Sequence, residues 1–183
     1  MGADTDGVRI RPETADDHGA VATVVGDAFG GPVEVRLVEA IRASDSYIPE
    51  LALVAERAGR VLGHVMISHV ELERAGDGGR RPIASLSPLA VAPDVHRQGI
   101  GSALVRAVTA GADRRGEPLV VLEGDPRYYG RFGFEHSVRY GIHITLPDWA
   151  PPEAAQVMRL RAYDPSLIGR VVYPPAFDVA AGH

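Results

Sequence analysis

The residues best placed to do chemistry follow an apolar segment in the middle of the chain. There the sequence reads Leu89-Ala-Val91, then a polar loop containing Arg97, then Gly99-Ile-Gly101 at the start of a helical pattern. Glycine has no side chain, so a ligand can approach the N–H groups of the first helical turn, which have no intrahelical partner and carry partial positive charge. Together with Arg97, these groups predict a site for a pyrophosphate. The alternative is a glycine-rich helix start that binds nothing.

A second stretch places aromatic hydroxyls beside the end of another strand. Residues 119–134 read LVVLEGDPRYYGRFGF. The pair Asp125-Pro126 predicts the start of a short helix, and Gly133 predicts its end. This helix presents Tyr128 and Tyr129 next to the strand end. We expect one tyrosine to pack inward and the other to turn its hydroxyl toward the neighbouring cleft; the alternative for Tyr129 is a core aromatic.

The same residues are compatible with another chemistry. Gly99 and Gly101 are followed about 20 residues later by Glu123 at a strand end, as in a dinucleotide fingerprint, which makes a nicotinamide-dependent oxidoreductase an alternative. Leu104 stands where that fingerprint has a small residue, and this counts against it. For an acid–base reaction, Glu71 and Glu123 are candidate general bases, and a chain of waters is a third option.

The elements that must position these groups can be read from hydrophobic periodicity and turn residues. Strands are predicted at 8–11, 51–56, 61–72, 83–91, 119–124, near 134 and at 155–160, and helices at 15–28, 33–43, 99–115 and from 126. Pro88 interrupts the strand at 83–91, so we expect a bulge or a splayed edge there. The predicted fold is α/β (α+β): one domain over 1–183, with a core at about 8–141 and a C-terminal strand plus packed tail at 142–183.

Composition excludes several classes of function. The chain has 183 residues, of which 45% are apolar, and no cysteine; all 19 basic residues are arginine. Cysteine nucleophiles, thiolate zinc sites and Schiff-base lysines are therefore absent. A net charge of −5 without a basic stripe argues against a nucleic-acid partner. No membrane-length apolar run is present and the Met1–Asp6 segment is acidic, so we expect a cytoplasmic protein; the histidine pair His64 and His69 is not expected to hold a metal.

Taken together, the two stretches resemble the GNAT superfamily of N-acetyltransferases, in its small bacterial branch. In that family a bulged strand, a loop of pattern Gln/Arg-x-x-Gly-x-Gly/Ala and a helix bind acetyl-CoA. Here the loop reads His96-Arg-Gln-Gly-Ile-Gly101, with histidine at the first position. The run from Tyr129 to Phe134 is similar to the family's Tyr-x-x-x-Gly-Phe signature. Two motifs in the right order are more specific than either alone.

The resemblance implies a fold and roles for particular residues. The sheet should be mixed and mostly antiparallel, with a splayed central strand pair flanked by helices. The backbone of Leu89, Ala90 and Val91 should pair with the pantetheine arm of acetyl-CoA, and Tyr129 should act as the general acid. The pyrophosphate should be bound by the loop and first helical turn: Arg97, Gln98, Gly99, Ile100, Gly101 and Ser102. The reaction is direct acetyl transfer to an amine in a ternary complex, without a metal.

The acceptor amine is left open. Two regions, 29–51 and 136–152, should shape the acceptor side, and they contain Glu34, Glu39, Tyr47, Tyr140 and Trp149. The acceptor is either a small molecule or a protein amine. A non-catalytic acyl-CoA sensor with the same fold is the second hypothesis, and the proline-rich tail either packs on the domain or mediates a homodimer.

Overall fold

The computed structural model describes residues 7–180, so the expectations about Met1–Asp6 lie outside the described part. The chain divides into two compact units. The first comprises residues 1–68, 87–111 and 175–183, and the second comprises residues 69–86 and 112–174. Two long strands, β3 (Arg60–Arg74) and β4 (Arg80–Val91), each contribute one part to each unit.

The first unit is an antiparallel sheet covered by helices. Besides parts of β3 and β4, it contains β1 (Arg9–Pro12), α1 (His18–Phe29), α2 (Val33–Arg42), β2 (Ala52–Arg57) and the beginning of α3 (Ile100–Arg115). Strands β1, β2 and β3 pair antiparallel in that order. The predicted turn between β2 and β3 is confirmed: Ala58 and Gly59 have φ angles of 50° and 78°, a left-handed pair typical of two-residue hairpins.

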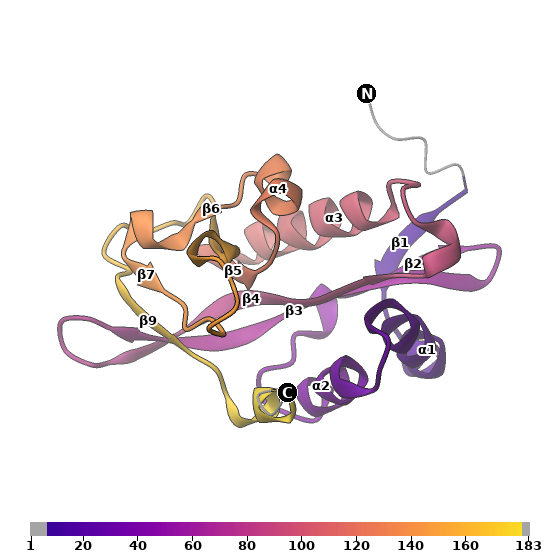
Figure 1. Ribbon diagram of the computed structural model, residues 1–183, viewed down its shortest axis with the longest axis horizontal. Helices are drawn as coiled ribbons and strands as arrows, with labels where there is room; N and C mark the ends of the chain where they lie inside the picture. Colours follow the sequence, from indigo (N-terminus) through magenta and orange to yellow (C-terminus); the bar gives the residue numbers. More distant parts are fainter. Residues whose placement is uncertain (1–6, 181–183) are drawn as a thin grey trace. The chain divides into compact units, whose positions relative to one another are not determined.

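Helices cover both faces of the strands in the first unit. In Figure 1, α1 and α2 lie on one side of β3 and the beginning of α3 lies on the other. Successive side chains of a strand point to opposite faces. Accordingly, a Cβ on Gly63 would meet Leu104 and Ile100 of α3, whereas the next residue, His64, has its Nδ1 3.5 Å from the carboxylate of Glu13.

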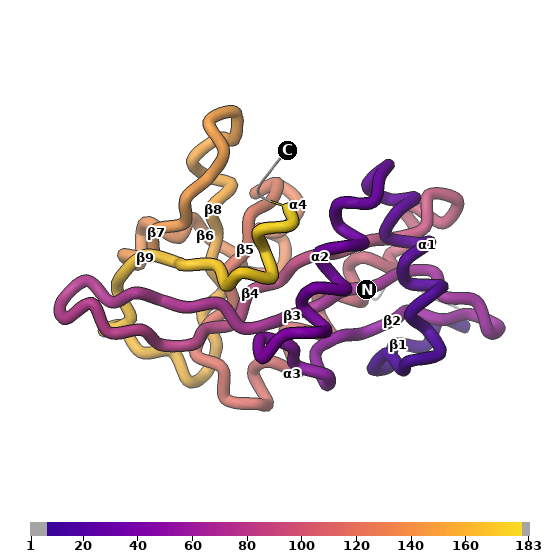
Figure 2. The backbone as a smooth tube through the Cα atoms, turned by 90° about the horizontal axis from the view of Figure 1, so that it is seen from below, coloured from indigo at the N-terminus to yellow at the C-terminus, as the bar shows by residue number. Residues whose placement is uncertain are grey.

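The N-terminal helices are close to their predicted positions, with one correction. Residues Ala15–Asp17 form a 3₁₀ turn, so the α-helix begins only at His18. The reason is local: the Asp17 carboxylate accepts hydrogen bonds from the backbone N–H and hydroxyl of Thr14 at 2.8 and 3.0 Å, which closes a tighter turn. Gly30, with φ 73°, ends α1 as predicted. The C-terminal 3₁₀ turn Pro175–Val179 packs beside α2 (Figure 2).

The second unit contains the remaining strands. These are parts of β3 and β4 together with β5 (Leu119–Glu123), α4 (Pro126–Tyr129), β6 (Glu135–His136), β7 (Ile142–His143), β8 (Ala155–Arg159) and β9 (Gly169–Val172). Strand β8 pairs antiparallel with both β5 and β6, and β9 pairs antiparallel with β3. The pairs β4–β5 and β7–β9 are parallel. The sheet is therefore mixed and mostly antiparallel, as predicted.

Strand β4 differs from its prediction in one respect. It runs without interruption from Arg80 to Val91, through the cis Ser87–Pro88 peptide bond, so the expected interruption at Pro88 is wrong. The expected splay is present, because the register of β4 with β5 consists of Ala84↔Val120 and Ser85↔Val121. A proline beyond those pairs removes no N–H from this ladder. Throughout residues 7–180, the helices are too short or too polar to cross a membrane.

Candidate active site

Hydrogen bonds hold the loop after β4 to the ends of β3 and β4. The backbone N–H of Ala92 donates to the carbonyl of Leu62 at 2.8 Å, and a 3₁₀ turn at Pro93–Val95 follows. The imidazole Nε2 of His96 lies 2.9 Å from the carbonyl oxygen of Val91, to which its N–H donates. The histidine at the first motif position therefore ties the loop to the strand.

The loop itself has an unusual backbone. Arg97 and Gly99 have φ angles of 63° and 79°, both in the left-handed region. Such alternation turns successive N–H groups toward one side and makes an anion-binding concavity. The first α3 donor to an intrahelical carbonyl in this turn is Ala103, whose N–H bonds to the Gly99 oxygen at 3.0 Å. The amides of Ile100 and Gly101 precede it, so they belong to the unpaired first turn of the helix.

The helix that begins at this loop is held close to the sheet by a glycine that the sequence analysis missed. A Cβ on Gly63 would lie 2.9 Å from Leu104 Cδ1, 3.1 Å from the Ala90 carbonyl oxygen and 3.2 Å from Ile100 Cγ2. No side chain other than hydrogen fits without movement. Gly63 thus sets the distance between β3 and the start of α3; its only sequence signal was a glycine inside a strand pattern.

Two polar contacts connect the loop with the β2–β3 hairpin. Arg60 pairs with both oxygens of Asp94 at 2.8 and 2.9 Å, and Arg57 donates to Gln98 at 3.4 Å. Both side chains of the Arg60–Asp94 pair are 57% exposed, so the pair adds little stability. Arg97 and Gln98 are exposed, whereas Ile100 is buried and anchors the turn.

Tyr129 lies in the second unit, on the short helix after β5. Asp125 caps this helix by accepting the N–H of Arg127 at 2.9 Å, and Gly133 follows with φ 98°, as predicted. The Tyr129 ring lies against Gly124: a Cβ there would be 2.5 Å from Tyr129 Cε2. Phe134 contacts the ring edge to face, with centroids 5.7 Å apart. Burial raises the pKa of the Tyr129 hydroxyl, so it stays protonated at neutral pH.

The neighbouring tyrosine has a different environment. Tyr128 packs edge to face on Phe132, with centroids 5.5 Å apart, under the guanidinium of Arg131. Both tyrosine residues are half-buried, so neither is fully packed inward as one of them was expected to be.

Of the two candidate bases, Glu123 has the more distinctive surroundings. It ends β5, and its Oε1 accepts the hydroxyl of Tyr173 at 2.7 Å. Burial raises the pKa of the Glu123 carboxyl, and the Tyr173 hydrogen bond opposes this shift. Glu71 is half-buried on β3, opposite Val172 of β9.

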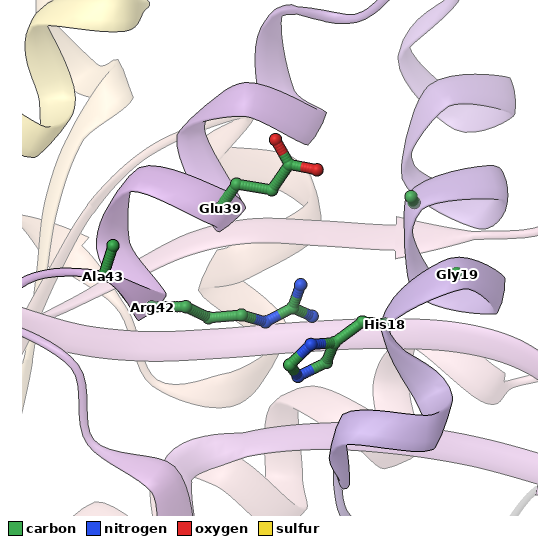
Figure 3. Close-up of a pocket in the computed structure, with 6 residues that line it drawn as sticks. His18, Gly19, Glu39, Arg42 and Ala43 are labelled. Atoms are coloured by element: carbon green, nitrogen blue, oxygen red, sulfur yellow. The ribbon is translucent and has the colours of Figure 1, made fainter.

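The residues predicted to shape the acceptor side belong to both units. Glu39 lines a hollow of about 470 Å³ between α1 and α2, together with His18 and Arg42 (Figure 3). Tyr140 donates to Glu135 at 2.8 Å in the second unit. Glu34 is half-buried on α2, and Trp149 is 83% exposed.

Tyr47 belongs to a buried polar cluster that the sequence did not reveal. The Glu13 carboxylate, only 1% exposed, accepts from the Nε and a terminal nitrogen of Arg42 at 2.8 and 2.7 Å and from the Tyr47 hydroxyl at 3.0 Å. His64 completes the cluster, and burial lowers its pKa to about 4. We name these four residues the Glu13 cluster. Its members are far apart in sequence, so no local spacing indicates it.

The two histidines of β3 lie in different surroundings. His64 is fully buried, while His69 lies in the second unit with its Nε2 2.9 Å from Glu117. Within the described part of the chain, no three His, Asp or Glu side chains are grouped so as to hold a metal ion.

The sheet is mixed, and its strands β4 and β5 run parallel and pair over two residues only. The dinucleotide-binding fold has a mostly parallel sheet instead, so this sheet argues against the oxidoreductase alternative. Residues 9–137 match the family described as "Acetyltransferase (GNAT) domain". The chain belongs to this family of acetyltransferases.

Two similar proteins are also described as N-acetyltransferases. The chain is 32% identical to the uncharacterised N-acetyltransferase YjhQ of Escherichia coli K12, over 59% of each protein, which is less than two thirds of that relative's length. It is 28% identical to the uncharacterised N-acetyltransferase YhbS of the same strain, over 82% of this chain and 86% of YhbS.

Two solved structures share the fold. The crystal structure of E. coli YhbS in complex with CoA aligns with a TM-score of 0.82 at 29% identity, covering 93% of this chain and 92% of that one. A GNAT acetyltransferase from Brucella melitensis in complex with acetyl-CoA aligns with a TM-score of 0.75 at 30% identity, covering 93% and 98%. The predicted family and fold class are confirmed.

Proposed function

We propose that this protein transfers the acetyl group of acetyl-CoA to an amine by direct attack within a ternary complex. The observation that carries the proposal is the loop at the start of α3, where Arg97 and Gly99 both have left-handed backbones. This loop occurs in a chain of the GNAT family, and two structurally similar relatives are complexes with CoA and acetyl-CoA.

The cosubstrate would be held mainly by backbone groups. The pyrophosphate would accept hydrogen bonds from the loop and first helical turn and pair with the exposed Arg97; the residues assigned to it are Arg97, Gln98, Gly99, Ile100, Gly101 and Ser102. The pantetheine arm would pair with Leu89–Val91, which lie beyond the part of β4 paired with β5. Because His96 already donates to Val91, this pairing would use mainly Leu89 and Ala90.

The reaction needs one proton donor at the leaving sulfur. The neutral amine nitrogen bonds to the thioester carbonyl carbon and gives up a proton to a base, for which Glu71, Glu123 and a chain of waters are the candidates. The C–S bond breaks, and the leaving thiolate must be protonated. Tyr129 is assigned as the donor, since burial keeps its hydroxyl protonated. A thiol has a reference pKa of ~8.5, and burial raises the pKa of Tyr129 above the ~10 of a free tyrosine, so complete proton transfer is uphill. The hydroxyl would therefore act chiefly by hydrogen bonding to charge as it develops on sulfur.

Binding can be tested with two matched glycines. Gly99→Ala puts a side chain at φ 79° in the loop, and Gly59→Ala does the same at φ 78° in the β2–β3 turn, with no heavy atom within 4 Å of its Cβ. Strain should cost each variant roughly 1–2 kcal/mol. Acetyl-CoA should raise the melting temperature of the parent protein and of Gly59→Ala, but raise that of Gly99→Ala much less. Equal responses, or a response to NAD(H) instead, would contradict the proposal.

Catalysis is tested by thiol release from acetyl-CoA with a panel of primary amines. Tyr129→Phe should lower kcat roughly 100-fold, as expected for loss of a general acid, while acetyl-CoA affinity is unchanged. If acetyl-CoA binds but no amine releases thiol, the sensor hypothesis replaces this one. If Tyr129→Phe keeps full kcat, the tyrosine is not the acid.

A further inference from the structure

A pocket beside the end of β5 has no role in the function proposed so far. It has a volume of about 490 Å³ and lies entirely within the second unit. Most of its wall is apolar, including Leu146, Pro147 and Pro151. A mainly apolar pocket of a few hundred Å³ with few polar groups is typical of small-molecule sites.

The indole of Trp149 forms part of this wall and is 83% exposed. Tryptophan has the largest apolar surface of all side chains and normally buries most of it, so an indole left open on a pocket wall costs stability that ligand contact would recover. Another flat apolar or aromatic group can pack against such an exposed ring face.

The charge in the pocket comes from Glu123. Of the three charged residues lining it, Asp125 and Arg127 pair with each other, with Arg127 Nε 3.4 Å from Asp125 Oδ1. Within residues 7–180, the polar partner of the Glu123 carboxylate is the neutral Tyr173 hydroxyl at 2.7 Å, and no cation neutralises it. An isolated carboxylate at an apolar wall is complementary to an ammonium group.

The pocket also adjoins the residue proposed as general acid. Gly124 lines the pocket, and its Cα supports the Tyr129 ring, since a Cβ there would be 2.5 Å from Cε2. Glu123 precedes Gly124 directly in β5 and its continuation. A ligand seated here would have its polar end near the start of the segment that carries Tyr129.

We propose that this pocket binds the acetyl acceptor as a small primary amine on an aromatic or other flat apolar body, with the ammonium at Glu123 and the body against Trp149. The ammonium gives one proton to the Glu123 carboxylate before its nitrogen attacks the thioester. The inference rests on the proposed acetyl transfer, because it names the acceptor class of that reaction. The volume fits one small molecule, so a peptide amine is a different outcome of the test.

Ligand binding in this pocket can be followed by tryptophan fluorescence without any reaction, because Trp149 is the only tryptophan of the chain. Titration with 2-phenylethylamine should change the tryptophan emission saturably and shift it to shorter wavelength as the indole loses water. Two matched probes separate the contributions: ethanolamine has the amine without the body, and 2-phenylethanol has the body without the amine. Each should bind at least about tenfold more weakly.

Two variants test the residues. Glu123→Gln can still accept from Tyr173 but has no charge, and should weaken 2-phenylethylamine about tenfold or more while 2-phenylethanol is unaffected. Glu153→Gln removes an exposed carboxylate near the pocket and should change nothing. In thiol-release assays, Trp149→Ala should raise KM for 2-phenylethylamine and leave KM for acetyl-CoA unchanged.

The outcomes are distinguishable. If amines are acetylated with no preference for an apolar body and the tryptophan emission does not respond, the pocket inference is wrong and the transferase proposal stands. If the emission responds but no amine releases thiol, the pocket binds amines and the transferase proposal fails. Preferential acetylation of a peptide N-terminus, with 2-phenylethylamine inert in both assays, overturns the small-molecule assignment.

Discussion

Glu13→Gln should be among the most destabilising single substitutions in the first unit. The Glu13 carboxylate is only 1% exposed and holds Arg42 through two bonds of 2.8 and 2.7 Å and Tyr47 through one of 3.0 Å. Glutamine has nearly the same shape but no charge, and one of its two polar atoms is a donor. In the variant the glutamine NH2 group therefore faces donors of Arg42 or Tyr47. The Arg42 guanidinium, which is 11% exposed, also loses its counterion.

The expected loss follows from that uncompensated charge. Removing one partner of a buried ion pair costs about 3–5 kcal/mol, against a total stability of about 5–15 kcal/mol for a typical domain. At roughly 2–4 °C per kcal/mol for a chain of this size, the melting temperature should fall by about 6–20 °C. The two bonds to Arg42 and one to Tyr47 place the loss within this range rather than at the ~1 kcal/mol of a surface pair.

Urea unfolding followed by circular dichroism measures the change. Glu39→Gln is the matched control: it removes the same charge from an exposed side chain in the hollow next to Arg42, and should cost less than about 0.5 kcal/mol. Adding Arg42→Met to Glu13→Gln should recover part of the loss, because the stranded cation is removed. A Glu13→Gln loss under about 1 kcal/mol, or equal to that of Glu39→Gln, would refute the reasoning.

Three further predictions test other parts of the molecule. Burial lowers the pKa of His64 from 6.5 to about 4, so between these pH values the unfolded chain binds more protons than the folded protein. The free energy of unfolding should therefore fall by about 3 kcal/mol as the pH drops from 7 to 4. In His64→Leu, the urea midpoint should depend less on pH over this range. Gly63→Ala should overpack Leu104 and the start of α3, cost ~1–3 kcal/mol and raise the Kd for acetyl-CoA in calorimetry; an unchanged Kd would show that the loop tolerates the shift. Gly124→Ala should displace the Tyr129 ring and lower kcat about as much as removing its hydroxyl does, and a kcat within about twofold of the parent would contradict the assignment.

The sequence predicted best those elements whose signal is local. The helix after the glycine loop has an apolar stripe at helical spacing, and Ile100, Leu104 and Val108 are buried as that stripe requires. Asp125 caps the start of α4, and Gly133 ends the 3₁₀ turn Gly130–Phe132 that continues it, close to the predicted limits, because caps depend on neighbouring residues only. The loop residues of the candidate site were predicted from local spacing in the same way.

What the sequence could not predict depends on partners distant in the chain. Arg42 lies 29 residues from Glu13 and Tyr47 lies 34, so no spacing rule connects them. Strand β7 has two residues, too few for an alternating pattern to be recognised. Pro88 was expected to interrupt a strand that is continuous, since the rule against proline assumes a ladder on both edges, and β4 pairs with β5 only at Ala84–Ser85.

Two adjacent residues of β3 should affect different properties of the first unit, one its stability and the other its affinity for acetyl-CoA. Gly63 faces Ile100 and Leu104 beneath the coenzyme loop, whereas His64 faces the Glu13 cluster on the opposite side of the strand. A change in the cluster should alter the fraction of folded protein but not the acetyl-CoA affinity of the molecules that remain folded. A change at Gly63 moves the helix that carries the loop, so it should alter that affinity directly. Glu13→Gln and Gly63→Ala, compared at a temperature where both are fully folded, should therefore differ in Kd even though both are destabilised.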